Sequence, residues 1–233
     1  MEKAVVYSGT RNVYADMVPA AKSLFLHTPV DRVYFLIEDD AFPYPLPDRI
    51  VTVNVSGQTW FAPDGPNYNS HWTYMVLLRA VLAKVLPDEH LVLSLDNDTV
   101  VMGDVSDLWD YDLSDSYMAG VIEPMKATPE LRYVNLGVVM MNLDKFRADE
   151  MDTKACAELN REAYHFPEQD VLSRLCSGHI LELPKKYNVC DGCDSRGVGP
   201  RIRHFAGERN WRGEPLIQKH RNLRWREIPN AWK

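Results

Sequence analysis

The sequence is poor in cysteine and contains no long hydrophobic run, and each shortage excludes a class of protein. Only four cysteines occur in 233 residues, and the single CxxC, Cys190 and Cys193, lacks the second pair or matched histidines of a structural zinc site. We therefore expect these two to be reduced thiols in a loop. No stretch approaches the roughly 18 apolar residues that a membrane-spanning helix needs.

The first residues, MEKAVVYS, also lack the basic start and apolar core of a secretion signal, and they run directly into an apparent strand. These features together predict a cytoplasmic protein.

Positive charge is scarce over most of the chain. The net charge of -7 argues against a nucleic-acid partner, because such binding depends on Lys and Arg meeting phosphates. Residues 201–233 differ, with nine Lys or Arg and three Glu, a net of +6, so that residues 1–200 carry -7 - 6 = -13. This basic segment also contains Trp211, Trp225 and Trp232. It favours a packed carboxyl-terminal helix with a solvated basic face; the alternative is peripheral contact with an anionic membrane or an acidic acceptor.

The remaining pattern predicts one α/β domain over residues 1–233, with a mixed, mostly parallel sheet flanked by helices. A hydrophobic content of 45% is enough for a sizeable core. We expect strands at residues 4–8, 33–37, 50–55, 91–95, 117–122 and 179–183, and a second long apolar run covers 133–143. We expect helices at residues 14–26, 72–86, 153–163 and 168–175.

The most informative segment is LVLSLDND at residues 91–98. Its apolar part predicts a strand buried on both faces, and therefore a central parallel strand whose carboxyl end opens onto a ligand crevice. Asp96 and Asp98 repel each other there, so a hard divalent cation should lie between them, and such a cation usually serves a phosphate.

Two other interpretations of the acid pair stay open at this point. It is compatible with a solvated turn or a helix cap. DNDTV also matches the loop of haloacid-dehalogenase-type phosphatases, in which Asp96 would attack phosphorus and Asp98 would act as acid and base. That motif belongs after the first strand of its fold, however, and some ninety residues precede it here.

Taken with its neighbours, the segment resembles the family 8 retaining glycosyltransferases, which include glycogenin and bacterial lipooligosaccharide galactosyltransferases. The resemblance spans nearly the whole chain through blocks in the same order: VVYSGTRNVY, LLRAVLAKVLP, LSLDNDTVV, YVNLGVVMMNL, PEQD and HFAGERNW. It implies a Rossmann-like nucleotide-diphospho-sugar transferase domain of GT-A type. The implied reaction moves a hexose, with retention, from UDP-glucose or UDP-galactose to a hydroxyl of a glycan, lipopolysaccharide or protein.

The resemblance also implies a set of site residues. Mn²⁺, or Mg²⁺ in its place, would be held by Asp96, Asp98 and His204. The UDP-sugar would be bound by Ser8, Thr10, Asn12, Val13, Arg79, Asn97, Gly137, Gly207 and Arg209. Catalytic roles would fall to Asn135, Gln169 and Asp170.

The chain departs from the family pattern at three of these blocks. Leu136 replaces the usual Ala or Ser between Asn135 and Gly137, and Glu168 replaces an Asp. Arg209 stands one residue short of the position of the family's phosphate-binding Lys.

Three further questions stay open from the sequence. Arg79 lies in an apolar segment and must find an anion, so a structural salt bridge is the alternative to a donor contact. The acceptor side has no readable code, and Trp60 and His71 are the candidates for it. A sugar-nucleotide-binding protein without transfer activity is the rival to an enzyme.

Overall fold

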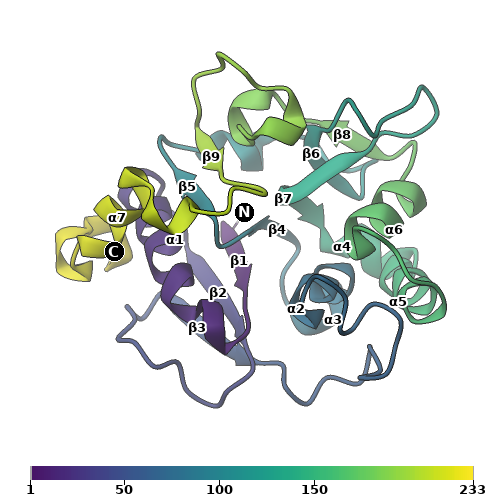
Figure 1. The fold of residues 1–233 in the computed structure, drawn as a ribbon, viewed down its shortest axis with the longest axis horizontal. Helices are drawn as coiled ribbons and strands as arrows, with labels where there is room; N and C mark the ends of the chain where they lie inside the picture. Colours follow the sequence, from purple (N-terminus) through teal and green to yellow (C-terminus); the bar gives the residue numbers. More distant parts are fainter. Residues whose placement is uncertain (1, 233) are drawn as a thin grey trace.

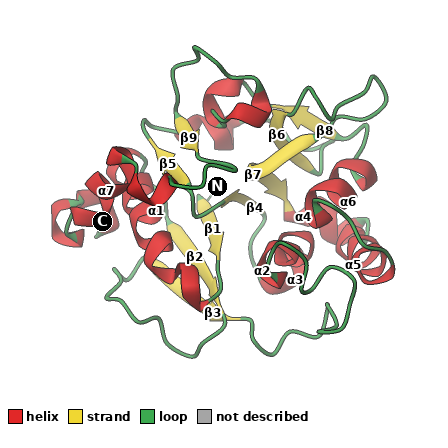
Figure 2. Ribbon diagram, viewed as in Figure 1, coloured by secondary structure: helices red, strands yellow, loops and turns green. Residues whose placement is uncertain are grey.

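A seven-stranded mixed sheet runs through the computed structural model, which describes residues 2–232 (Figures 1 and 2). Its order is β3-β2-β1-β4-β7-β6-β8. The strands are β1 Ala4–Ser8, β2 Arg32–Ile37, β3 Ile50–Asn54, β4 Leu91–Leu95, β6 Met118–Ile122, β7 Val134–Asn142 and β8 Ile180–Glu182. The helices are α1 Tyr14–His27, α2 Tyr74–Leu77, α3 Leu82–Val85, α4 Leu143–Ala148, α5 Met151–Arg161, α6 Pro167–Leu175 and α7 Pro215–Asn222. The predicted α/β class and mostly parallel sheet are confirmed.

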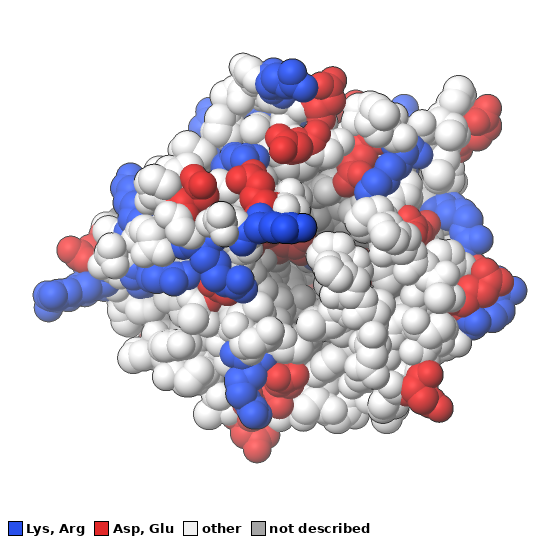
Figure 3. Space-filling model, viewed as in Figure 1, with Lys and Arg blue, Asp and Glu red and all other residues white. Residues whose placement is uncertain are grey.

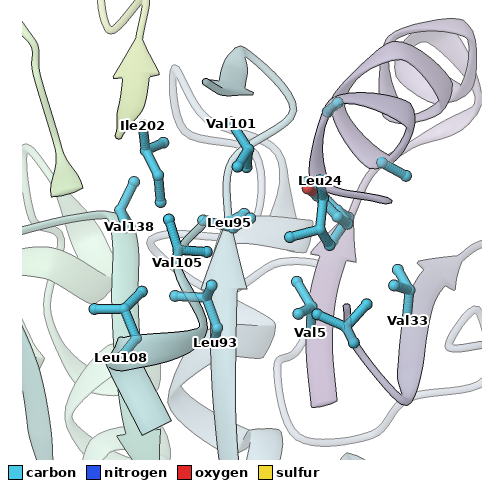
Figure 4. Packing of buried hydrophobic residues seen from close by; sticks show 14 of the residues in the cluster. Val5, Leu24, Val33, Leu93, Leu95, Val101, Val105, Leu108, Val138 and Ile202 are labelled. Atoms are coloured by element: carbon cyan, nitrogen blue, oxygen red, sulfur yellow. The ribbon is translucent and has the colours of Figure 1, made fainter. Parts of the chain in front are cut away.

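Helices cover both faces of the sheet. Successive residues of a strand point to opposite faces, so Val5 packs into one core cluster and Val6 into the other. The first cluster includes side chains of α1, and Figure 4 shows Leu24 of that helix beside residues of β1, β2 and β4. The second cluster lies under α2 to α6, on the other side of the sheet in Figure 1. Apolar residues therefore fill both faces of the central strands.

The expectation that β4 is a central parallel strand is half right. β4 is fully buried and central, and it pairs in parallel with β1, but it pairs antiparallel with β7. A strand is buried on both faces when helices cover the sheet above and below it. This burial does not determine whether each neighbouring strand runs parallel or antiparallel. The carboxyl end of β4 still opens at the edge where its acid pair stands.

The helix expected over residues 72–86 is also corrected. The segment forms α2, a 3-10 turn at Leu78–Val81 and then α3. The tightened turn carries Arg79, whose guanidinium is buried under the sheet edge.

A second, two-stranded sheet joins distant parts of the chain. β5, Thr99–Val101, follows the acid pair, and β9, Ile202–His204, pairs with it antiparallel. Thr99 stands opposite His204 in this register. The pairing therefore brings His204 to the acid pair from about a hundred residues farther along the chain.

The carboxyl-terminal segment packs on α1, as favoured from its sequence. Ile217 and His220 of α7 are buried, and basic side chains on the same helix remain partly or fully exposed. Asp16 of α1 is buried and accepts hydrogen bonds from Arg212 (2.8 Å) and Arg221 (3.0 Å). These ion pairs fasten the segment that follows His204 to the first helix.

Cys190 and Cys193 are free thiols within the predicted loop; Cys190 precedes the 3-10 turn Asp191–Cys193, and Cys193 ends it. Both are buried. Among the helices within residues 2–232, we find none with the length and apolar character needed to cross a bilayer.

Candidate active site

Asp96 and Asp98 stand on the turn between β4 and β5, and His204 ends β9 beside them. The Nε2 atom of His204 lies 3.3 Å from an oxygen of Asp98 and 3.8 Å from an oxygen of Asp96. One ligand atom from each of the three residues falls within 4.8 Å of the others. The three predicted metal ligands are therefore brought together.

The electrostatics of this cluster fit a cation. Burial would lower the pKa of His204, but the charge and hydrogen bond of Asp98 outweigh it and raise that pKa to about 10. Burial opposes ionisation of Asp98, and His204 nevertheless holds the pKa of that carboxyl below its usual value. Oδ1 of Asp98 is buried and, apart from the 3.3 Å approach of His204 Nε2, has no polar partner within residues 2–232. A divalent cation would satisfy it, and two carboxylates with an imidazole suit Mn²⁺.

A chain of amides orients the imidazole of His204. Nδ1 of His204 donates to Oδ1 of Asn188 at 2.9 Å, while Nδ2 of Asn188 donates to Oδ1 of Asn135 at 2.8 Å. Nδ2 of Asn135 in turn donates to Glu123 at 2.6 Å. Because Nδ1 carries the proton of this bond, Nε2 is the atom that faces the acid pair, the usual arrangement for a metal-binding histidine.

Gly137 makes the close approach of this imidazole possible. A Cβ atom at this position would stand 2.1 Å from Cε1 of His204, nearer than real Cβ contacts allow. Gly137 is one of the residues expected to bind the UDP-sugar; in the structure the space beside its Cα is taken by the His204 ring.

Arg79 finds its anions within the protein. Its guanidinium donates to Asp96 at 2.5 Å, to Glu168 at 2.8 Å and to the hydroxyl of Ser94 at 3.2 Å. The structural salt bridge considered from the sequence is thus present, and it holds one carboxylate of the acid pair in place. A direct contact between Arg79 and the donor stays a prediction.

Gln169 and Asp170 point to different places. Gln169 lines the cavity, accepts from the Leu136 backbone at 3.1 Å and donates to Glu123 at 3.3 Å. Asp170 is absent from the described cavity lining; it accepts hydrogen bonds from the Tyr133 hydroxyl and the Phe166 backbone. Successive residues on a helix point about 100° apart, and here the turn of α6 directs Asp170 away from the cavity. The structure therefore gives Asp170 a structural place at the start of α6.

The loop after β1 adjoins the acid pair. Nδ2 of Asn97 donates to the carbonyl of Ser8 at 2.7 Å, and the Thr10 hydroxyl donates to the Asn12 side chain. A Cβ atom on Gly9 would stand 2.6 Å from a methyl group of Val13, so a side chain here would displace Val13. The loop residues expected to bind the nucleoside lie outside the main cavity lining of residues 2–232, next to its acidic floor.

The loop after β9 contributes Gly207, which lines the cavity with a φ of +76° that suits glycine. Arg209 is exposed and is not among the described lining residues.

A cavity of about 650 Å³ connects these groups, a volume in the range of small-molecule sites. Figure 3 shows a hollow near the centre of this face with acidic side chains at its floor. The lining comprises Trp72, Val76, Arg79, Asp96, Asp98, Glu123, Pro124, Met125, Lys126, Asn135, Gly137, Phe166, Glu168, Gln169, Asp191, Gly192, Asp194, Arg196, His204, Ala206 and Gly207.

Three of the residues that build this site were missed from the sequence. Glu123 directly follows the strand predicted at residues 117–122. An acid after a strand is the same signal that pointed to Asp96, so Glu123 could have been predicted from the sequence. Asn188 and Trp72 carry no local signal. Of the two acceptor-side candidates, Trp60 is not among the described lining residues and packs against the second core cluster, whereas His71 packs edge-on against Trp72.

Glu168 should make stability depend on pH. Burial raises its pKa from 4.5 to about 7, because Arg79 is shared with Asp96 and only partly offsets the cost. The folded chain then binds a proton more tightly than the unfolded chain, so the free energy of unfolding falls as pH rises from about 4.5 to 7, by up to about 3 kcal/mol. Urea unfolding of wild type and Glu168→Gln across pH 5–7 measures this.

The variant should lack this decline, and Glu182→Gln, a change at an exposed acid on β8, should keep it. Equal pH slopes for wild type and Glu168→Gln would contradict the raised pKa.

Comparison with known proteins agrees with this geometry. The sequence matches the model of Glycosyl transferase family 8 over residues 31–206. Lipopolysaccharide 1,2-glucosyltransferase of Escherichia coli (strain K12) is 36% identical over 111 residues, covering 42% of this chain and 33% of that protein. Glycosyltransferase GlyE of Streptococcus pneumoniae serotype 4 (strain ATCC BAA-334 / TIGR4) is 25% identical over 203 residues, covering 83% and 49%.

Solved structures share the fold. GlyE of Streptococcus pneumoniae TIGR4 superposes with a TM-score of 0.76 at 20% identity, over 100% of this chain and 63% of that one. An active-site mutant of LgtC superposes with a TM-score of 0.74 at 20% identity, over 98% and 99% of the two chains. The expected GT-A fold is thereby confirmed.

The chain spans a third to about half of the length of these two curated relatives. The family model nevertheless matches more than half of the chain itself, in the segment that contains both acids of the pair and His204. The chain therefore belongs to glycosyl transferase family 8.

Proposed function

We propose that this chain transfers a hexose from a UDP-sugar to an acceptor hydroxyl, with retention at the anomeric carbon and with help from a divalent cation. The observation that supports this most strongly is the cluster of Asp96, Asp98 and His204 at the floor of the cavity, in a chain of this family.

The charges around the cavity explain why a cation would be needed. Six carboxylates line it, against four cationic side chains, those of Arg79, Lys126, Arg196 and the protonated His204. A diphosphate entering this acidic surrounding would be repelled. A bound Mn²⁺ would offset the charge of the diphosphate and of the leaving UDP. Mg²⁺ is the alternative ion, since both metals accept carboxylate oxygens.

The residues of the chain position the donor around this centre. Arg79 fixes the Asp96 carboxylate, and the amide chain from Glu123 to Asn188 fixes the His204 ring. Ser8, Thr10, Asn12 and Val13, on the loop beside Asn97, are proposed for the nucleoside. Gly207 and Arg209 are proposed for the diphosphate.

Retention is best explained by reaction on one face of the sugar. Gln169 is the group beside the expected sugar position, and an amide is a poor nucleophile, which disfavours a covalent sugar intermediate on it. The bond from the anomeric carbon to the phosphate oxygen breaks, the acceptor oxygen bonds to the same face, and the acceptor proton passes to the departing phosphate oxygen. Glu123 and Asn135, rather than Asp170, stand with Gln169 to orient the sugar.

The donor is proposed to be UDP-glucose or UDP-galactose. The name of one relative specifies a glucosyltransferase, and a structural neighbour is described as the galactosyltransferase LgtC in complex with donor and acceptor sugar analogs. The two sugars differ in the configuration of one hydroxyl group.

The phosphatase alternative is wrong, because the chain belongs to glycosyl transferase family 8 and its acid pair follows β4 rather than the first strand. The sugar-nucleotide-binding protein without transfer activity is the remaining rival, and catalysis separates the two.

Removal of one metal-binding carboxylate should abolish turnover and leave the fold intact. With Mn²⁺ and a panel of UDP-sugars, we expect UDP release by wild type to fall about a thousandfold in Asp98→Asn. Mn²⁺ with UDP should raise the melting temperature of wild type and leave that of the variant unchanged.

The matched control is Asp115→Asn, a change at an exposed acid outside the cavity, which should behave as wild type. Stabilisation by Mn²⁺ and UDP without UDP release or transfer would favour the binding protein. Full activity in Asp98→Asn would overturn the proposed metal site.

We also propose a cytoplasmic protein that contacts an anionic membrane through its basic carboxyl-terminal segment. Figure 3 shows Lys and Arg gathered over the region that Figure 1 assigns to α7 and the carboxyl terminus. Arg224 and Arg226 are exposed there, and the Trp232 side chain is 55% exposed. Such groups suit a headgroup layer.

Sedimentation with vesicles tests this contact. Wild type should bind vesicles containing 30% phosphatidylglycerol, and Arg224→Gln with Arg226→Gln should weaken binding about tenfold or more, since each surface charge is worth ~1 kcal/mol. Lys154→Gln with Arg161→Gln removes the same charge from α5 and should change little. Equal sedimentation with neutral phosphatidylcholine vesicles would contradict the proposal.

A further inference from the structure

Two of the large apolar side chains that remain exposed in residues 2–232 line the same cavity as the acid pair. Trp72 is 38% exposed and Met125 is 93% exposed. Leaving such apolar area in water is unfavourable. Their shared position at one cavity indicates a ligand that covers them.

Trp72 is held in a fixed orientation. Its indole N–H donates to the carbonyl of His165 at 3.3 Å, and its ring lies 6.3 Å from that of Phe166 at an angle of 34°. His71 meets it edge-on, with ring centroids 5.0 Å apart. The indole is therefore supported from behind, and its remaining surface is available at the cavity.

Trp72 and Phe166 together form an aromatic wall of the cavity. Phe166 connects this wall to the inner site, the part of the cavity around Gln169 and the acid pair. It is the residue before α6, and the first turn of that helix supplies Glu168 and Gln169, both 8% exposed. Lys126 lies 3.5 Å from the centroid of Phe166 and pairs with Glu123 at 2.7 Å. The exposed fraction of the side chains thus rises from the buried Gln169 to Trp72 and Met125. The aromatic wall therefore lies at the mouth of the cavity, where it opens to solvent.

The chemistry of the wall matches a sugar ring. One face of a hexopyranose presents several C–H groups, and the negative face of an aromatic ring attracts such weakly positive hydrogens. The hydroxyl groups on its rim need polar partners, which Glu123, Lys126, Asp191 and Arg196 provide along the same cavity.

We propose that Trp72, backed by Phe166, is the platform for the acceptor, and that this acceptor is a glycan presenting a pyranose ring rather than a protein side chain. The inference rests on the proposed function, because it requires the donor to occupy the inner site. The acceptor hydroxyl then approaches the anomeric carbon from the open mouth, since the diphosphate lies toward the acid pair.

Steady-state kinetics with two readouts tests the platform. With Mn²⁺ and the preferred UDP-sugar, hydrolysis of the donor alone reports the inner site, and transfer to methyl β-galactoside, methyl β-glucoside or methyl β-lactoside reports the acceptor site. Trp72→Ala should raise KM for the glycoside about tenfold and leave donor hydrolysis within about twofold. Trp72→Phe should recover most of the loss, because it keeps an aromatic face.

Met102→Ala is the matched control, because Met102 is 37% exposed but outside the described cavity lining, and it should change neither readout. An unchanged glycoside KM in Trp72→Ala would overturn the inference. So would an equal loss of donor hydrolysis, or transfer to a serine- and tyrosine-containing peptide in preference to every glycoside.

Saturation-transfer NMR separates this inference from the proposed function. In the presence of Mn²⁺ and UDP, the C–H protons of methyl β-lactoside should receive saturation from wild type and lose it in Trp72→Ala. Binding of this kind without any UDP release would support the platform and contradict transfer. Absence of saturation in wild type would overturn the platform even if donor hydrolysis were found.

Discussion

The pairing of β5 with β9 is the constraint on which the site depends. It places His204 against two carboxylates that would otherwise repel each other at the end of a buried strand. The imidazole supplies a positive charge beside them, because Asp98 raises its pKa to about 10 although burial opposes this. A divalent cation would take over that role by displacing the proton from Nε2.

The rest of the site holds these three side chains still. Arg79 reaches Asp96 from a tightened turn, while Asn188 accepts from His204 and is itself held by Asn135 of β7. Because Gly137 has no side chain, the imidazole ring of His204 can lie directly against its backbone. Because each support comes from a different element, the arrangement exists only in the folded chain. Such a preorganised centre can offset charge on a leaving group without rearranging during the reaction.

The sequence could predict the acid pair and the layers of the fold, because apolar runs and the carboxylates after them are local patterns. Other features depend on contacts that no local pattern encodes. The antiparallel neighbour of β4 could not be read from its burial, since helices cover both faces of the sheet in either case. Asp170 matched a family pattern, yet the turn of α6 directs it to Tyr133. Asn188 and Trp72 gain their positions only from tertiary packing.

The most direct test of the central claim is anomalous diffraction at the manganese absorption edge, from crystals grown with Mn²⁺ and UDP. We predict one strong peak within bonding distance, about 2.0 to 2.3 Å, of carboxylate oxygens of Asp96 and Asp98 and of Nε2 of His204. UDP density should reach the same peak through its diphosphate. A peak elsewhere, or UDP bound in the cavity with no manganese between these three side chains, would contradict the account.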